Sequence, residues 1–303
     1  MAVSQETPEW ECVLEARANV GECPIWSAEQ RVLFWIDVYK PALYRTEPES
    51  GTTDSWLLPA TVGSYALQAE GRAIVALSTG IYDLDLRSKH LTLLGEAPYD
   101  TRQYRFNDGR CDRQGRFWVG TTRLPTSSRP NGSSAFWRFD QRGLSLEVQG
   151  TTTANGIAFS PDGRTLYLAD EPNGQILALT YDPETGTASD LRTFACVPEG
   201  TVPDGAAVDS DGGYWIALIR AGRILRFGPD GTLDRELKAP CSTPTMVCFG
   251  GPGLGTLYVT TARRPLDEEG LGREPLAGAI FRSDVGARGV SEPFFVASPF
   301  RVK

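Results

Sequence analysis

A pattern of short apolar segments separated by polar turns repeats six times along the 303-residue chain. Each unit runs from an apolar segment through a turn, usually with glycine, into an aromatic or aliphatic segment and then a third strand. Aligning the middle segments superposes six side chains at intervals of 40 to 49 residues: Trp35, Val75, Trp118, Tyr167, Trp215 and Tyr258. Such an interval is typical of a four-stranded propeller blade. The repeat therefore predicts an all-β fold, a six-bladed β-propeller with four antiparallel strands per blade.

The six units leave only short pieces at the two ends, so we expect residues 1–303 to form one propeller domain. The N-terminal ECVLEA (residues 11–16) and the C-terminal EPFFVAS (residues 292–298) are expected to pair and supply the outer strand that closes the ring. The alternative is a pair of β-sandwiches, but sandwiches need no fixed repeat along the whole chain.

The charge balance and the absence of long apolar segments limit the choice of partners. The net charge is −8 and no run of Lys or Arg stands out, which argues against nucleic acid and anionic membranes. No apolar segment approaches the roughly 20 residues of a membrane span, and the N-terminus has no secretory pattern. We therefore expect a cytoplasmic protein. The acidic surface and the lack of an obvious exposed strand edge favour a monomer. The six cysteines form no CxxC pair, so free thiols are expected.

A single histidine, His90, limits the chemistry that the chain can perform. It follows a polar turn in RSKHLTLLG, where a surface position is expected. Ser-His-Asp and Cys-His catalysis and multi-histidine metal sites would all depend on this one residue, so we set them aside. Catalysis is then left to carboxylates, amides, hydroxyls, arginines or a metal ion bound by oxygen.

The residues 11 to 13 places before each superposed side chain stand directly ahead of the innermost strand of each blade. Innermost strands surround the central channel and start at the same end of it, so these positions should meet at one channel mouth. They are Glu22, Ser64, Asn107, Asn155, Asp204 and Thr245. Two carboxylates with one or two amide oxygens make an oxygen-only site for a hard divalent ion.

The competing interpretation is that Asn155-Gly156 and Asp204-Gly205 are turn dipeptides. It does not explain Glu22, and it leaves two carboxylates to repel each other in a narrow channel. A bound cation removes that repulsion. By contrast, Asp162, Asp211 and Asp230 lie in hairpin turns between strands, and we assign them to those turns.

Four long motifs resemble one known family. They are GECPIW (21–26), RFNDGRCDRQGRFWVGTT (105–122), NGIAFSPDGRTLYLAD (155–170) and VPDGAAVDSDGGYWIA (202–217). In this order and spacing they resemble the senescence-marker-protein/regucalcin/gluconolactonase family. The resemblance implies a six-bladed propeller with one divalent ion at the channel mouth and hydrolysis of sugar (aldono-) lactones. It implies that Glu22, Asn155 and Asp204 hold the metal, and that Arg105 and Asn107 face the ligand beside it.

The chain departs from the family pattern at three places. Cys23 stands where the family usually has Gly or Ser. RLPTSS (123–128), which contains Arg123, replaces an acidic pair of the animal members, and IRAG (219–222) replaces a His and Trp pattern and puts Arg220 near the mouth. A different sugar or a different pattern of hydroxyl contacts is therefore expected.

For the mechanism, we expect the metal to polarise the lactone carbonyl and Asp204 to serve as both ligand and proton acceptor for the attacking water. A metal-bound hydroxide would serve without Asp204. Tyr104 and Arg123 are expected as rim contacts to the substrate, and Asp108 as a residue that turns the chain. The donor set does not choose among calcium, zinc, manganese, magnesium and ferrous iron.

Two other functions fit the same fold. One is hydrolysis of phosphotriesters or aryl esters, as in paraoxonase-like propellers, which a less polar pocket would favour. The other is a non-enzymatic calcium-binding regulator. No EF-hand loop and no element with two alternative states is evident in the sequence, which argues against a dedicated sensor.

Overall fold

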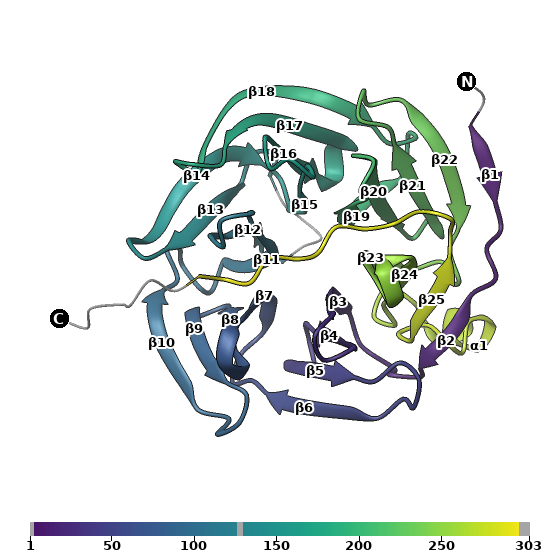
Figure 1. Ribbon diagram of the computed structural model, residues 1–303, viewed down its shortest axis with the longest axis horizontal. Coiled ribbons are helices and arrows are strands. Elements are labelled where there is room, and N and C mark those ends of the chain that lie inside the picture. The colour runs from purple at the N-terminus through teal and green to yellow at the C-terminus, as the bar shows by residue number, and fades with distance from the viewer. Residues whose placement is uncertain (1–2, 126–129, 297–303) are drawn as a thin grey trace.

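The computed structural model describes residues 3–125 and 130–296, and these form six β-sheets arranged around a central axis (Figure 1). Five sheets have four strands and the sixth has a fifth strand at its edge. Within each blade the four main strands pair antiparallel, and in five of the six blades their order from the centre outward follows the sequence. The predicted six-bladed propeller with four antiparallel strands per blade is confirmed.

The first three blades use consecutive strands. Blade 1 consists of β3 (Gly21–Ser27), β4 (Val32–Asp37), β5 (Ala42–Thr46) and β6 (Thr53–Leu57). Blade 2 consists of β7 (Val62–Gln68), β8 (Arg72–Leu77), β9 (Gly80–Asp85) and β10 (Leu91–Glu96). Blade 3 consists of β11 (Tyr104–Cys111), β12 (Phe117–Arg123), β13 (Ser134–Asp140) and β14 (Gly143–Thr151).

Among the last three blades, blades 5 and 6 include the N-terminal strands. Blade 4 consists of β15 (Ala154–Phe159), β16 (Thr165–Asp170), β17 (Gln175–Asp182) and β18 (Thr187–Cys196). Blade 5 consists of β19 (Val202–Val208), β20 (Tyr214–Ile219), β21 (Arg223–Phe227) and β22 (Leu233–Lys238), with β1 (Ser4–Glu6) parallel to β22. Blade 6 consists of β23 (Pro244–Gly250), β24 (Thr256–Thr261), β25 (Ile280–Asp284) and β2 (Glu11–Leu14).

Short helical segments interrupt the turns of the described chain. The 3₁₀ segments are η1 (Ala69–Gly71), η2 (Glu171–Asn173) and η3 (Pro252–Leu254), and the one α-helix described, α1 (Glu268–Arg273), lies between β24 and β25. No helix in the described ranges is long and apolar enough to cross a membrane. All six cysteines are free, and His90 is exposed, as the sequence predicts.

The six side chains that the repeat superposes all lie in the second strand of their blades and are buried. They pack both within and between blades: the indole of Trp35 stacks on Tyr44 of the same blade at 4.1 Å between ring centroids. Trp118 meets Phe159 of the next blade at 6.3 Å, and Trp215 meets Phe249 of the next blade at 5.6 Å. Burying such aromatic rings removes a large apolar area from water, which is the main favourable term for this core. Each repeat of the sequence thus contributes one of these buried side chains to the core.

The ring closes through the N-terminal segment, and this corrects part of the sequence prediction. β2, which lies within ECVLEA, pairs antiparallel with β25 as the outer strand of blade 6. EPFFVAS does not pair with it, and its last two residues lie outside the described residues. Residues 285–296 instead cross the centre of the ring, where the amide N–H of Phe295 donates to Leu67 O at 2.8 Å (Figure 1). The apolar pattern of this segment suits either packing, so the sequence does not distinguish them.

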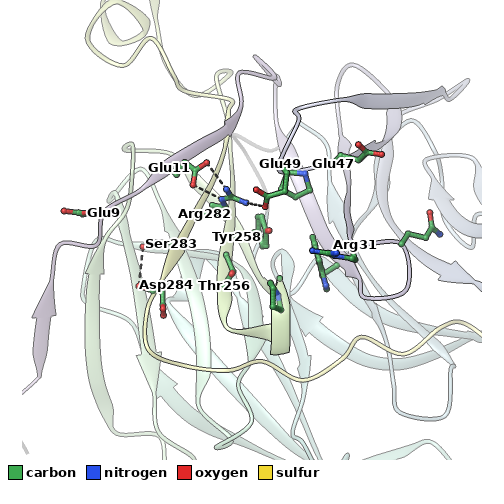
Figure 2. A pocket seen from close by; sticks show the side chains of 15 residues that line it. Glu9, Glu11, Arg31, Glu47, Glu49, Thr256, Tyr258, Arg282, Ser283 and Asp284 are labelled. Carbon is green, nitrogen blue, oxygen red and sulfur yellow. Dashed lines mark hydrogen bonds and ion pairs between the residues drawn. The ribbon is translucent and has the colours of Figure 1, made fainter.

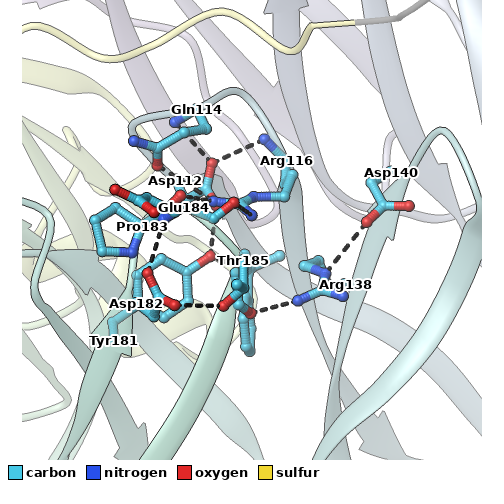
Figure 3. A network of polar contacts seen from close by, with 12 residues as sticks. Asp112, Gln114, Arg116, Arg138, Asp140, Tyr181, Asp182, Pro183, Glu184 and Thr185 are labelled. Carbon is cyan, nitrogen blue, oxygen red and sulfur yellow. Dashed lines mark hydrogen bonds and ion pairs between the residues drawn. The ribbon is translucent and has the colours of Figure 1, made fainter.

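A buried polar network joins blades 3 and 4 (Figure 3). The Asp112 carboxylate accepts hydrogen bonds from the backbone N–H groups of Gln114 and Arg116, both at 2.9 Å, and from the hydroxyl of Tyr181 in blade 4. The Arg116 guanidinium pairs with Asp112 and donates to Pro183 O. A buried carboxylate with this many donors fixes its neighbours in place. The network therefore holds the two blades that carry Asn107 and Asn155 in a fixed relation.

Candidate functional site

A β-bulge lies near the start of the innermost strand in every blade. In each one the pairing with the second strand shifts by one residue, for example between Glu22 and Ile25 in β3 and between Asn155 and Ala158 in β15. The corresponding shift in β19 falls between Pro203 and Ala206 and so encloses Asp204. A bulge re-aims side chains that regular pleating would turn into the sheet. The site residues therefore face the channel because of the bulges.

Two of the bulges contain a residue with a left-handed backbone conformation. Gly156 has φ = 60° and Cys23 has φ = 50°, both in the left-handed region. A Cβ at Gly156 would lie 2.4 Å from the Tyr214 hydroxyl oxygen, so only glycine fits there. The Asp204-Gly205 dipeptide thus lies inside a bulged strand, whereas Asp211-Gly212 lies in the turn between β19 and β20. This difference separates a channel-facing aspartate from a turn residue.

The strand starts surround a cavity of about 610 Å³ at one mouth of the channel. Five predicted site residues line it: Glu22, Arg105, Asn107, Asn155 and Asp204. Ser64 and Thr245, at the equivalent positions of blades 2 and 6, are buried and are not among the described lining residues. The convergence that the repeat predicts is therefore present in four blades, and Arg105 adds a cation beside it.

Two carboxylates, those of Glu22 and Asp204, line the floor of this cavity. Burial raises the pKa of Glu22, and the negative charge of Asp108 raises it further. Burial likewise raises the pKa of Asp204 well above its ordinary range, with the charges of Glu22, Glu171 and Asp108 adding to the shift. Buried like charges at close quarters are unfavourable unless a cation is present. The floor therefore favours a positive charge.

A chain of hydrogen bonds orients the amides of the floor. The Arg105 Nη1 donates to Asn107 Oδ1 at 2.8 Å, and Asn107 Nδ2 donates to Asn155 Oδ1 at 2.5 Å. Asn155 Nδ2 in turn lies 3.4 Å from Glu171 Oε2. Because each amide has one donor side and one acceptor side in use, the carbonyl oxygen of Asn155 has a defined direction. Asn107 thus both lines the cavity and positions Asn155.

The donor set fits a hard divalent cation. Glu22 and Asp204 supply carboxylate oxygens and Asn155 supplies an amide oxygen, the ligand type that calcium, magnesium and manganese prefer. The Asp108 Oδ1 is also buried without a hydrogen-bond partner in the described structure. Within the described ranges no three His, Cys, Asp or Glu side chains are grouped as metal ligands. An amide therefore has to complete any such site.

Asp108 differs from the sequence prediction. It does not turn the chain, because it lies inside β11, where the bulge directs its carboxylate into the cavity. Its Oδ2 accepts a hydrogen bond from the backbone N–H of Ile157 at 2.9 Å, which ties blade 3 to blade 4. The Asp-Gly dipeptide that suggests a turn is here part of a bulged strand.

Tyr104 and Arg123 are not among the described residues that line the channel cavity. They pair with each other between β11 and β12, and Tyr104 lines a separate hollow of about 350 Å³ together with Tyr99 and Trp137. The rest of the RLPTSS loop, residues 126–128, lies outside the described residues. The cavity therefore gives these two predicted contacts no support.

Four lining residues were missed or weakly placed by the sequence reasoning: Tyr39, Glu171, Arg220 and Arg264. Each follows the second strand of its blade, four to six positions after the superposed aromatic side chain. In a propeller blade the second strand runs antiparallel to the first, so at its end the chain is back at the channel mouth where the first strand starts. Applying the repeat register beyond the second strand would have found them.

A second cavity, of about 660 Å³, lies between blades 1 and 6, at the ends of their strands that are remote from the channel cavity (Figure 2). Its centre is Arg282, whose guanidinium pairs with Glu11 and Glu49 at 2.8 and 2.6 Å. These charges satisfy one another, and the predicted site residues are at the opposite mouth. Five predicted site residues in the described ranges therefore belong to the smaller cavity.

Comparison with known proteins matches residues 20–263 to the family model described as SMP-30/Gluconolactonase/LRE-like region. A 6-deoxy-6-sulfogluconolactonase of Pseudomonas putida is 40% identical over 287 residues, covering 94% of this chain and 97% of the relative. A regucalcin of Xenopus laevis is 30% identical over 291 residues, with 94% and 97% covered. A solved regucalcin of Agrobacterium tumefaciens, described as a calcium-binding protein, superposes with a TM-score of 0.92 at 24% identity, covering 97% of this chain and all (100%) of that one.

Proposed function

The chain belongs to the SMP-30/gluconolactonase/LRE-like family, and from that premise we propose that it hydrolyses a sugar lactone to the aldonic acid with the help of one divalent metal ion. The observation that supports this most is the meeting of Glu22, Asn155 and Asp204, from three different blades, on the floor of one polar cavity. The name of the Pseudomonas putida relative supports a lactone as the substrate.

In this proposal Glu22, Asn155 and Asp204 hold the metal. The chemistry that a bound divalent ion supplies here is polarisation of the lactone carbonyl. The buried like charges of Glu22 and Asp204 provide the affinity, and the hydrogen bond from Asn107 keeps the Asn155 oxygen directed to the site.

The remaining steps use the chain's own groups. Asp204 accepts a proton from the water that adds to the carbonyl carbon. The ring C–O bond then breaks, and the proton ends on the released hydroxyl, so the ester becomes an acid and an alcohol. Arg105 lines the cavity, so its guanidinium group offers a donor to a lactone oxygen. Asn107 lines the same wall and orients the substrate beside it.

The first test compares two aspartates of the same blade. Chelator-treated protein is given each of calcium, zinc, manganese, magnesium and ferrous iron, and proton release is followed with a panel of pentono- and hexonolactones. Asp204→Asn is expected to lower the metal-dependent rate by at least about 10²-fold. Asp211→Asn, which changes the turn Asp-Gly, is the matched control and is expected to keep the rate of the unchanged protein.

Two outcomes contradict the proposal. If no metal gives lactone opening above the buffer rate, the lactonase function is wrong, and phosphotriester hydrolysis and metal-dependent binding are the alternatives to test. If Asp204→Asn and Asp211→Asn behave alike, Asp204 has neither of the roles assigned to it.

A further inference from the structure

The rim of the channel cavity differs in charge from its floor. The floor is formed by buried or half-buried residues at the starts of the innermost strands, among them Glu22 and Asp204. The rim is formed by segments that follow the second strands: on blades 1, 5 and 6 these contribute Tyr39, Arg220 and Arg264, and on blade 4 they contribute the half-buried Glu171. Both of these arginines are exposed. Carboxylates thus lie deep in the cavity, and guanidinium groups lie on one side of its opening.

Tyr39 connects two of the arginines that line the cavity. The guanidinium carbon of Arg264 lies 3.8 Å from the centroid of the Tyr39 ring, and that of Arg105 lies 5.5 Å from it. The Arg105 Nη2 also lies 3.5 Å from the Tyr39 hydroxyl oxygen. Burial raises the pKa of the Tyr39 phenol, but the two guanidinium groups more than offset this and hold it below its ordinary value. The phenol therefore stands in a field that favours negative charge.

Two of these arginines have no ion-pair partner: in the described ranges no carboxylate lies within ion-pair distance of Arg220 or Arg264, whereas Arg223, close to Arg220, pairs with Glu236 at 3.3 Å. Arg105 differs, because its charge acts on the carboxylates of Glu22 and Asp204. Arg220 also has φ = 66°, a left-handed conformation that is unfavourable for a residue with a Cβ. Two guanidinium groups that line one cavity without a carboxylate partner are suited to bind a sulfonate, phosphate or carboxylate through charge-assisted hydrogen bonds.

We propose that Arg220 and Arg264 form an anion subsite, so that the preferred lactone carries an anionic group at the end away from its carbonyl. The proposal rests on the proposed function, since it places the lactone carbonyl on the floor with Glu22 and Asp204. With the carbonyl there, the other end of the substrate reaches the rim. Tyr39 lines the same cavity and packs against Arg264, so its ring positions that guanidinium group at the rim.

The test measures substrate preference. The metal-loaded protein is assayed with glucono-1,5-lactone and with the same lactone bearing a 6-sulfonate, a 6-phosphate or a terminal carboxylate. We expect kcat/KM to be higher for at least one anionic lactone than for the neutral one. The anionic lactone with the highest kcat/KM identifies the anion that the subsite prefers. The ratio of anionic to neutral kcat/KM should fall as salt is added, because screening weakens the attraction at an exposed rim.

Substitutions assign the preference to the two arginines. Arg220→Gln and Arg264→Gln should each lower the ratio of anionic to neutral kcat/KM roughly ten- to hundredfold, the effect of losing a hydrogen bond to a charged group. Arg264→Lys should restore part of it. The matched controls are Arg223→Gln and Arg263→Gln, which lie beside the two residues but do not line the cavity in the described structure, and they should keep the ratio of the unchanged protein.

The outcomes separate this proposal from the one it rests on. If the neutral lactone is opened at least as well as every anionic one, or if neither Arg→Gln variant changes the ratio, the anion subsite is wrong and the lactonase proposal stands. If no lactone is opened with any metal, the lactonase proposal fails and the subsite fails with it.

Discussion

The function proposed for this propeller depends on a few oriented side chains at the channel mouth. Glu22, Asn155 and Asp204 come from three blades, and Asn107 comes from a fourth to hold Asn155. The Asn107 amide uses its oxygen for Arg105 and its nitrogen for Asn155 and for Ala154 O. Residues that orient metal ligands commonly matter almost as much as the ligands.

Asn107→Ala is therefore expected to weaken metal binding by about 10- to 100-fold, because the Asn155 oxygen loses the donor that directs it. The measurement is a titration of chelator-treated protein with manganese or calcium. Asn173→Ala is the control, since the Asn173 amide is exposed and bonds to Asp170. Equal affinities in the two variants would show that Asn107 has no positioning role.

At the residue scale, the register of the repeat predicts which side chains meet at the channel mouth, whereas the type of a residue alone does not. Glu22, Asn155 and Asp204 were predicted because they occupy equivalent places in different blades. Asp108 was misread because Asp-Gly has the same appearance in a turn and in a bulge, and only strand pairing distinguishes them. Tyr104 and Arg123 were chosen from a motif without a register argument, and neither is among the described cavity residues.

At the scale of single elements, the bulge in each innermost strand is the feature that builds the site. In β15 it places Asn155 toward the cavity and leaves Gly156 in a left-handed conformation against the Tyr214 hydroxyl, which donates to Gly156 O at 2.8 Å. The alternation of apolar residues predicted the strand, but it contains no information about one extra residue in the pairing.

Gly156→Ala is expected to lower both metal affinity and lactone hydrolysis by at least tenfold, since the added Cβ meets the Tyr214 oxygen and shifts the bulge. Gly71→Ala is the control: Gly71 also has positive φ, 71°, but has no neighbouring atom within 4 Å of an added Cβ. Both variants should lose roughly 1 kcal/mol of unfolding free energy to backbone strain. If Gly71→Ala reduces activity as much as Gly156→Ala, the loss reflects general strain and not the bulge.

The N-terminal strand β1 offers a pH test of an element. Glu6 accepts from Arg235 Nε and Nη2 at 2.7 and 2.6 Å, and this hydrogen bonding lowers the pKa of Glu6 against the opposing effect of burial. A carboxyl with a lowered folded-state pKa stabilises the fold above its unfolded pKa of about 4.5, and this is lost as the pH falls through the folded value. Because both side chains are still partly exposed, Arg235 at 21% and Glu6 at 29%, we expect no more than about 1 kcal/mol.

Glu6→Gln should accordingly be less stable than the unchanged protein at pH 7 and equally stable near pH 3. The measurement is the midpoint of thermal unfolding of both proteins between these pH values. A difference that stays constant with pH would contradict the ion pair as its cause.

At the scale of the whole molecule, the segments near the two chain ends stabilise different parts of the ring. The N-terminal β2 closes the ring in blade 6, and residues 285–296 cross the end of the channel opposite the cavity (Figure 1). There Glu292 pairs with the buried Arg110, whose Nη2 also donates to Ala206 O at 2.7 Å. Arg110 is two residues from Asp108 on β11, so the crossing segment supports the floor of the cavity from below.

Glu292→Ala is expected to cost about 3 kcal/mol of unfolding free energy, because it leaves the Arg110 charge buried without its partner. Arg110→Met combined with Glu292→Ala should recover part of this loss, since no unpaired charge remains. Glu269→Ala, which breaks an exposed pair with Arg273, is the control and should cost less than about 1 kcal/mol. Denaturant unfolding measures all three, and equal losses in Glu292→Ala and Glu269→Ala would contradict a supporting role for the crossing segment.

The most direct measurement follows metal occupancy and lactone opening in the same titration. Chelator-treated protein receives increasing amounts of the metal that gives the highest rate, and bound metal and proton release from the lactone are recorded at each addition. The account predicts that the rate rises in proportion to occupancy and levels off at one ion per chain, and that Asp204→Asn shows neither change. A full rate in the metal-free protein, or a rate that does not follow occupancy, would contradict it.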